Sequence, residues 1–219
     1  MTEYESINLQ LTLYTMISPI PKIFLYFNFN SIIYIGDDME YSIIKEMKPT
    51  KLESKSLEET FVPFLIENNF TISTAESLTA GIISGTIANV PGSSNVLELG
   101  LVTYTEEYKN KALNVSRETL SKYSAVSYET CNEMLDGLSE TTNSQLLIAA
   151  TGYAGPGENA GLVYLGVQFK KTRKIFKLEL KGKRNEIRKK VVNLSFNHAR
   201  NIIEGKEGYR LHVNKIYTL

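Results

Sequence analysis

The sequence predicts an α/β fold, a single domain in which helices flank a mixed β-sheet, with a short β-rich extension at its N-terminus. Strand-like and helix-like segments alternate along the chain from about residue 50 onward. The continuous apolar run 145–151 has the length and composition of a strand that is buried on both faces. The chain has 219 residues, of which 42% are hydrophobic. This composition suits an ordinary globular domain and excludes collagen-like, coiled-coil and wholly disordered chains.

Residues 1–50 are predicted to form the extension. Apolar and polar residues alternate over 7–13, and the segment 23–29 is rich in β-branched and aromatic side chains. Two strands with Pro19 and Pro21 in the turn between them would make a hairpin that adds to a sheet.

The alternative for this extension is that its first 38 residues are not translated and that synthesis starts at Met39. The most hydrophobic stretch, 17–35, is interrupted by prolines, a lysine and asparagines. We therefore do not expect it to form a membrane-spanning helix, which needs about 20 nearly continuous apolar residues. The acidic start of the chain argues against a secretory signal.

The main domain is predicted over residues 51–205, with a tail at 206–219. Its apolar residues recur either at helical spacing or in short runs bounded by glycine, proline and polar residues. Helices are predicted at about 56–68, 77–90, 105–113, 116–122, 127–140 and 185–203. Strands are predicted at about 70–74, 97–104, 145–151, 162–169 and 175–180.

Ser77 lies at a predicted strand-to-helix junction. Ser73 and Glu76 have the spacing of a capping box, which would place Ser77 in the first helical turn. Free backbone N–H groups there favour an anion, such as a phosphate or a developing alkoxide. The alternative is that Ser73, Ser77 and Thr79 only cap the helix.

Tyr104 ends a predicted strand, and Lys109 follows about one helical turn later. The ends of strands in an α/β sheet form the usual ligand crevice. A lysine that is desolvated there can lose its proton near neutral pH and act as a general base. The alternative is an ordinary solvated lysine, and Lys111 competes for the same role.

A glycine-rich loop follows the predicted strand 145–151. Gly152, Gly155 and Gly157 permit close approach of the backbone to a ligand and could present N–H donors. The loop lacks both the Walker and the dinucleotide-binding patterns. It is also compatible with a plain turn.

Charge is unevenly distributed, although 24 basic residues balance 24 acidic ones. Eleven basic and two acidic residues lie between Lys170 and Lys190, so the remainder of the chain is acidic. This basic cluster could bind nucleic acid or a phosphorylated ligand. The alternative, which we favour for most of its side chains, is a solvated surface.

Cysteine and histidine are scarce. Cys131 is the single cysteine, and His198 and His212 lie far apart in the sequence. This excludes an internal disulfide framework and a cysteine-built zinc site, and it suits a reducing cytosol. We therefore expect a cytoplasmic protein with no metal and no cofactor.

Five short motifs occur in an order that resembles the C-terminal domain of the competence/damage-inducible protein CinA. The resemblance spans about residues 55–204. The motifs are Thr74–Gly81, Pro91–Ser94, Val102–Tyr104 with Lys109, Ala125–Ser127 and Thr151–Gly157.

Active members of that family hydrolyse the carboxamide of nicotinamide mononucleotide to nicotinate mononucleotide and ammonia. The resemblance implies that Ser77 is the nucleophile and that Lys109 is its general base. It also implies that Tyr104 assists these two residues or positions them. It also implies a homo-oligomer that binds a small nucleotide and needs no metal. The substrate-binding residues that it implies are Glu76, Thr79, Ser93, Ser94, Thr151, Gly152, Gly155, Arg184 and Arg188.

Two departures from the family pattern leave rivals open. Ala80 stands where the family usually has a second glycine, and the loop 157–161 is shorter than usual. The first rival is a nucleotide-binding or regulatory module that has lost efficient turnover. The second is a nucleic-acid-binding protein that uses residues 170–190, which we rank last because aromatic residues for base stacking are sparse there.

Overall fold

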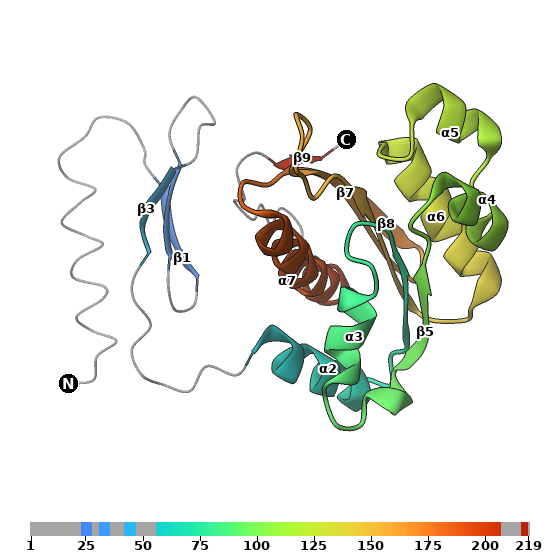
Figure 1. Cartoon of the computed structure of the whole chain (residues 1–219). Helices are drawn as coiled ribbons and strands as arrows, with labels where there is room; N and C mark the ends of the chain where they lie inside the picture. The colour runs from blue at the N-terminus through green and yellow to red at the C-terminus, as the bar shows by residue number, and fades with distance from the viewer. Residues whose placement is uncertain (1–22, 28–30, 36–41, 47–55, 207–215, 219) are drawn as a thin grey trace, which may run out of the picture. The chain divides into compact units, whose positions relative to one another are not determined.

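The computed structural model describes residues 23–27, 31–35, 42–46, 56–206 and 216–218. The chain divides into two compact units, Met1–Ser54 and Lys55–Leu219 (Figure 1). In the first unit, β1 (Ile23–Phe27), β2 (Ser31–Ile35) and β3 (Ser42–Glu46) form an antiparallel sheet in that order. β1 falls within the predicted segment 23–29. The strand expected at 7–13 and the proline turn lie outside the described residues.

The second unit contains a mixed six-stranded sheet of order β5-β4-β6-β7-β8-β9. β4 is parallel to both β5 and β6, whereas the later neighbours are antiparallel. This arrangement confirms the predicted α/β class with a mixed sheet. The strands are β4 (Ile72–Glu76), β5 (Leu97–Val102), β6 (Leu146–Gly152), β7 (Leu162–Phe169), β8 (Thr172–Glu179) and β9 (Ile216–Thr218).

Helices cover both faces of this sheet (Figure 1). One face carries α2 (Leu57–Glu67), α3 (Ile82–Ala88) and α7 (Arg184–Ile203). The other carries α4 (Glu106–Leu113), α5 (Arg117–Tyr123) and α6 (Tyr128–Thr141). The short 3₁₀ helix η1 (Ser93–Asn95) precedes β5.

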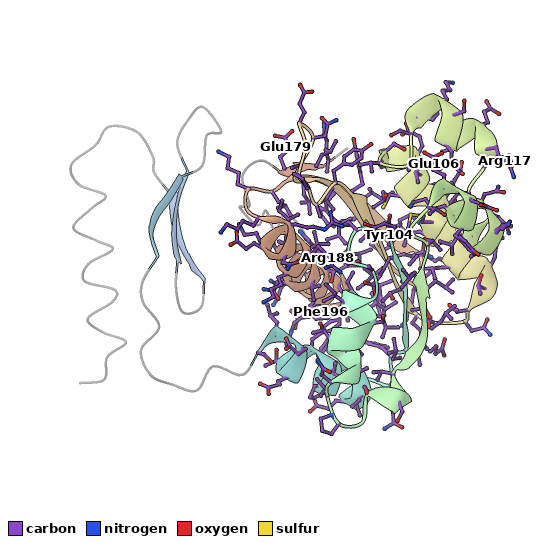
Figure 2. The ribbon with its side chains drawn as sticks, viewed as in Figure 1. Tyr104, Glu106, Arg117, Glu179, Arg188 and Phe196 are labelled. Atoms are coloured by element: carbon purple, nitrogen blue, oxygen red, sulfur yellow. The ribbon has the colours of Figure 1, made fainter. Side chains whose placement is uncertain are left out.

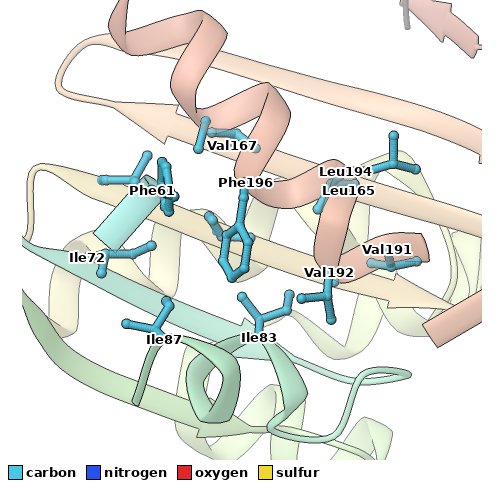
Figure 3. Close-up of a cluster of buried hydrophobic side chains, with 14 of the residues drawn as sticks. Phe61, Ile72, Ile83, Ile87, Leu165, Val167, Val191, Val192, Leu194 and Phe196 are labelled. Carbon is cyan, nitrogen blue, oxygen red and sulfur yellow. The ribbon is translucent and has the colours of Figure 1, made fainter. Parts of the chain in front are cut away.

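Each face has its own apolar core. On the α2–α3–α7 face, the Phe61 and Phe196 rings stack with centroids 5.1 Å apart, close to Ile83 (Figure 3). On the α4–α6 face, Met134 and Leu135 are fully buried. Burial of each such side chain stabilises the fold by about 1.5–3 kcal/mol.

Local sequence sets the helix starts. The Thr105 and Ser127 hydroxyls accept hydrogen bonds from backbone N–H groups three residues later, which begins α4 and α6. Gly137 in α6 lies against α4, and a Cβ at this position would be 2.2 Å from the carbonyl oxygen of Leu113. Glycine is therefore required there for the two helices to approach this closely.

The capping box predicted at Ser73–Glu76 is wrong. These residues belong to the central strand β4, and α3 begins only at Ile82, after Gly81 with φ of 86°. Backbone pairing with β5 and β6 on both sides outweighs the local capping preference. Ser77 therefore lies in the connection between strand and helix, and not in the first helical turn.

Candidate active site

Ser77 follows β4 at the point where the chain connections diverge. From β4, the chain passes through α3 on one face to β5, and then returns through α4–α6 on the other face to β6. Ligands of open α/β sheets bind outside the carboxyl ends of the strands at such a switch point. The topology thus places Ser77 where a substrate can reach it.

Side-chain alternation brings Ser77 to the α4 face of the sheet. Along β4, Ile72 belongs to the α2–α3–α7 core and Ala75 belongs to the α4–α6 core. Ser77 is two residues beyond Ala75 and therefore continues on the α4–α6 side. Its backbone N–H donates to the carbonyl oxygen of Ala150 at 2.9 Å, which ties the residue to β6.

Lys109 on α4 meets Ser77 inside the protein. Its Nζ atom donates to Ser77 Oγ and to the carbonyl oxygen of Thr103, both at 2.9 Å. Lys109 is 1% exposed and Ser77 is 7% exposed. The structure therefore brings together the two residues for which the resemblance implies the roles of base and nucleophile.

Burial alters the protonation of Lys109. Loss of solvent disfavours the ammonium form and lowers its pKa from 10.5 to about 8, although the nearby Glu106 carboxylate partly opposes this change. At pH 7, a lysine with this pKa is neutral for roughly a tenth of the time, some 300-fold more than an ordinary lysine. The amine is therefore able to accept the Ser77 proton.

Glu76 anchors the connection that carries Ser77. Its buried carboxylate accepts hydrogen bonds from the backbone N–H groups of Ile83 and Ser84 at 3.0 and 2.9 Å, and from the hydroxyls of Ser84 and Thr74. These bonds occupy the start of α3, so those N–H groups are not available to an anionic ligand. The predicted anion site at the helix start is accordingly filled by the protein's own carboxylate.

Arg188 from α7 holds the same connection from the other side. Its Nε donates to the carbonyl oxygen of Leu78 and its Nη2 to that of Thr79, each at 2.9 Å. Among the hydrogen bonds of the described residues, none is donated by the backbone N–H of Leu78 or Thr79. These two N–H groups directly follow Ser77 and are candidates for stabilising an oxyanion.

Arg184 connects two other predicted site residues. Its Nη1 donates to the carbonyl oxygen of Gly155 at 2.6 Å, and its Nη2 donates to the Tyr104 hydroxyl at 2.9 Å. Tyr104 is about half exposed, and Figure 2 labels it together with Arg188. These contacts link the glycine loop, the end of β5 and the start of α7 at the same end of the sheet as Ser77.

Thr151 and Gly152 have structural partners. The Thr151 hydroxyl donates to the carbonyl oxygen of Ala125 at 2.6 Å, which holds the segment before α6 against β6. A Cβ on Gly152 would lie 2.7 Å from the carbonyl oxygen of Leu162 on the neighbouring strand. Thr79 differs, because its buried hydroxyl has no hydrogen-bond partner in the described part of the chain.

Ser93 and Ser94 are not brought to Ser77. α3 carries the chain back to the end of the sheet where β4 and β5 begin. These serines lie there in η1, just before the start of β5. The separation along the sheet is roughly 15 Å, the length of a five-residue strand at about 3.3 Å per residue. The Ser93 hydroxyl instead approaches the carbonyl oxygen of Ala88 at 3.4 Å.

The basic cluster is partly engaged within the protein. Arg173 bonds Gln168 and Asn132 and forms an ion pair with Asp136 at 2.6 Å. Lys170 lies over the ring of Phe169, 5.0 Å from its centroid. Several side chains of the cluster therefore stabilise the fold or lie along its surface.

The described residues contain no group of three or more histidine, cysteine or acidic side chains able to hold a metal ion. Cys131 is buried, which raises the pKa of its thiol to about 12. His198 is buried against the Phe176 ring, and this burial lowers the pKa of its imidazole to about 4. His212 lies outside the described residues. None of the helices in the described part of the chain is long and apolar enough to cross a membrane.

Sequence reasoning predicted free N–H groups after Glu76 as donors to an anion, but it placed them in a helical turn and not in a loop. It did not identify the Thr103 carbonyl that accepts from Lys109. Backbone groups carry no signal in the residue letters, because every residue has them. The partners of Arg188 were also unexpected, since an arginine 109 residues away from Thr79 gives no local sign of its contact.

These features define an α/β domain with a buried serine–lysine pair at the switch point of its sheet. Residues 54–203 match the CinA C-terminal domain family. This match covers well over half of the chain, and the chain therefore belongs to that family.

Relatives and solved structures agree with this assignment. The chain is 42% identical over 142 residues to a putative competence-damage inducible protein of Clostridium novyi, an alignment that covers 63% of this chain and 34% of the relative. It is 40% identical over 151 residues to a CinA-like protein of Kosmotoga olearia, covering 67% and 37% respectively. The chain thus spans about a third of the length of the curated relatives that it matches.

The fold also resembles crystal structures. The competence/damage inducible protein CihA of Agrobacterium tumefaciens superposes with a TM-score of 0.64 at 30% identity, over 68% of this chain and 97% of that one. The competence damage-inducible protein A (ComA) of Klebsiella pneumoniae gives a TM-score of 0.66 at 26% identity, over 69% and 97%.

Proposed function

We propose that this chain is an amidohydrolase that uses Ser77 as nucleophile and Lys109 as general base. The contact between Lys109 Nζ and Ser77 Oγ is the single observation that carries the proposal. A serine hydroxyl is a weak nucleophile until an adjacent base takes its proton, and serine–lysine pairs perform this step on several unrelated folds.

The reaction can be followed with these residues. Neutral Lys109 accepts the Ser77 proton while Oγ attacks the carbonyl carbon of the amide, and the N–H groups of Leu78 and Thr79 stabilise the oxyanion. The Lys109 ammonium then returns its proton to the leaving nitrogen, which departs as ammonia. Water, activated by the same amine, hydrolyses the acyl-enzyme and restores Ser77.

The proposed substrate is nicotinamide mononucleotide, the carboxamide substrate implied by the resemblance to the CinA family. Hydrolysis would give nicotinate mononucleotide and ammonia, which is a step in pyridine nucleotide recycling. Arg184 and Tyr104 lie at the surface between the glycine loop and α7, and they are the proposed contacts of the nucleotide. A guanidinium suits the substrate phosphate because it offers paired donors to an anion.

The test is ammonia release from nicotinamide mononucleotide by the purified chain, with nicotinate mononucleotide followed in parallel. Ser77→Ala and Lys109→Ala are expected to abolish turnover. Lys111→Ala is the matched control, because Lys111 lies on the same helix and pairs with Glu107 at the exposed surface. Unchanged release from the Ser77 and Lys109 variants would refute the mechanism, and binding without turnover would favour a regulatory nucleotide-binding module.

A further inference from the structure

Arg188 makes contacts that a substrate-binding arginine would not need. Its Nε and Nη2 atoms lie along one edge of the guanidinium, and each donates to a backbone carbonyl of the connection after Ser77, those of Leu78 and Thr79. This is one of the two edges through which a guanidinium can bind a phosphate in bidentate fashion. The remaining Nη1 atom is 3.5 Å from Asn185 Oδ1. Arg188 is half-buried, so these bonds are partly shielded from water.

Most backbone carbonyls of the connection 77–81 accept a hydrogen bond. The Ser77 carbonyl accepts from Ala80 N–H at 3.1 Å, and the Thr79 carbonyl accepts from Ile82 N–H at 3.2 Å as well as from Arg188. The Leu78 carbonyl accepts from Arg188. Within the described residues, the N–H groups of Leu78, Thr79 and Gly81 are left without an acceptor, and the first two directly follow Ser77.

Peptide geometry links these carbonyls to the unassigned N–H groups. In a trans peptide, the carbonyl of one residue and the N–H of the next point in opposite directions within one rigid plane. A bond that fixes the Leu78 carbonyl therefore also fixes the direction of the Thr79 N–H. The bond from Ala80 to the Ser77 carbonyl fixes the Leu78 N–H in the same way.

We propose that Arg188 is a positioning residue that holds the Thr79 N–H as an oxyanion donor beside Ser77. This inference rests on the proposed role of Ser77 as nucleophile. In this role Arg188 acts on the transition state through the backbone. Arg184, which also bonds Gly155 and Tyr104 but lies at the exposed surface, remains the proposed ligand of the substrate phosphate.

The two roles for Arg188 predict different kinetics. A positioning residue affects kcat with or without a phosphate on the substrate, whereas a phosphate ligand mainly affects KM for the phosphorylated substrate. We would measure both constants for nicotinamide mononucleotide and for nicotinamide riboside, which lacks the phosphate. A second measurement is the rate at which a fluorophosphonate probe labels Ser77, since this reaction also develops negative charge on oxygen.

The variants are Arg188→Met, Arg188→Lys and the control Lys189→Met, which removes an exposed charge from the same helix. Arg188→Met is expected to lower kcat for both substrates and the labelling rate by about 10–100-fold, because a donor displaced by 1 Å can cost 100-fold. Arg188→Lys should recover part of this loss, since an ammonium can still bond one carbonyl. Thermal unfolding of each variant reports whether the fold is intact, and Arg188→Lys carries the test where Arg188→Met does not fold.

Two outcomes would overturn the inference, and a third would overturn only the proposed substrate. One is a raised KM for the mononucleotide alone, with kcat and the labelling rate unchanged, which assigns Arg188 to the phosphate. If the wild-type chain labels at Ser77 but does not hydrolyse the mononucleotide, only the proposed substrate fails, and the labelling rates still decide the role of Arg188. If the wild-type chain neither labels nor turns over, both proposals are wrong.

Discussion

Replacement of Lys109 by methionine should make the protein more stable at neutral pH while it abolishes catalysis. Methionine is unbranched and apolar and fills nearly the same volume. The wild-type chain keeps a lysine almost completely out of water, and this burial lowers its pKa from 10.5 to about 8. Such a shift corresponds to about 3 kcal/mol of destabilisation at pH 7, where the unfolded chain carries a fully solvated ammonium.

The substitution also removes hydrogen bonds. It leaves the Thr103 carbonyl and the Ser77 hydroxyl without their lysine partner. The Ser77 hydroxyl is not completely buried and can rotate, so the lasting cost is that of the unpaired Thr103 carbonyl, about 1–2 kcal/mol. The expected net gain for Lys109→Met is therefore about 1–2 kcal/mol in the free energy of unfolding at pH 7.

The pH dependence isolates the contribution of the charge. Between pH 8 and pH 10.5 the unfolded chain binds more protons at Lys109 than the folded chain, so the wild-type stability attributable to this residue rises with pH. The methionine variant has no such group. Its advantage over wild type should therefore shrink by about 2.5 kcal/mol between pH 7 and pH 10, and at the upper end wild type should be the more stable protein.

Urea unfolding of wild type and Lys109→Met at pH 7 and pH 10 measures this difference directly. Lys111→Met is the matched control, since it removes an exposed lysine from the same helix. Comparing the variants at each pH cancels the titration of all other groups. A stability difference that stays constant from pH 7 to pH 10 would refute the claim that burial suppresses the charge of Lys109.

Four further predictions concern the same region. The kcat/KM for the amide substrate should rise with pH up to about 8 and then level off, because only neutral Lys109 accepts a proton; a flat profile across this range would contradict a lysine base. Ala80→Gly should raise the free energy of unfolding by about 0.5–1 kcal/mol, because Ala80 has a left-handed φ of 50°, and a lowered Tm would count against this strain. Glu76→Ala should cost about 3 kcal/mol in urea unfolding, because it leaves buried donors at the start of α3 unpaired, and a loss below 1 kcal/mol would contradict that anchor. Gly137→Ala should cost about 2–3 kcal/mol and reduce activity, because the new methyl group would push α4, which carries Lys109, away from α6; full activity with unchanged Tm would exclude this coupling.

Much of the fold was predictable because the spacing of apolar residues matches the residues that are buried along most of the described chain. The run 145–151 reads as a buried strand, and β6 is indeed buried along nearly its whole length. The polar start of β8, from Thr172, was missed because its partners on β7 are set by pairing across the hairpin and not by an apolar pattern. The residues Ser73–Glu76 have the spacing of a capping box but lie inside a central strand. There the hydrogen bonds to β5 and β6 on both sides determine the backbone conformation.

The candidate site was predictable mainly through the resemblance to the CinA family. Residue pattern alone left Ser77 as a possible helix cap and Lys109 as a possible solvated lysine; the resemblance paired them, and the structure places them in contact. Ser93 and Ser94 show what the order of motifs along the chain does not predict. Closeness in sequence does not reveal at which end of the strands a segment lies. The catalytic roles of Ser77 and Lys109, the roles of the other predicted site residues and the oligomeric state stay predictions.

The position of β5 has a consequence for local opening. In the described sheet, β5 is the outermost strand beside β4, and α4 with Lys109 follows it directly. Edge elements open with lower free energies than the core of a sheet. Detachment of this edge would separate the amine from Ser77 while β4, β6 and β7 stay paired. Amide hydrogen exchange along β5 would therefore report how often the folded chain loses the contact between Lys109 and Ser77.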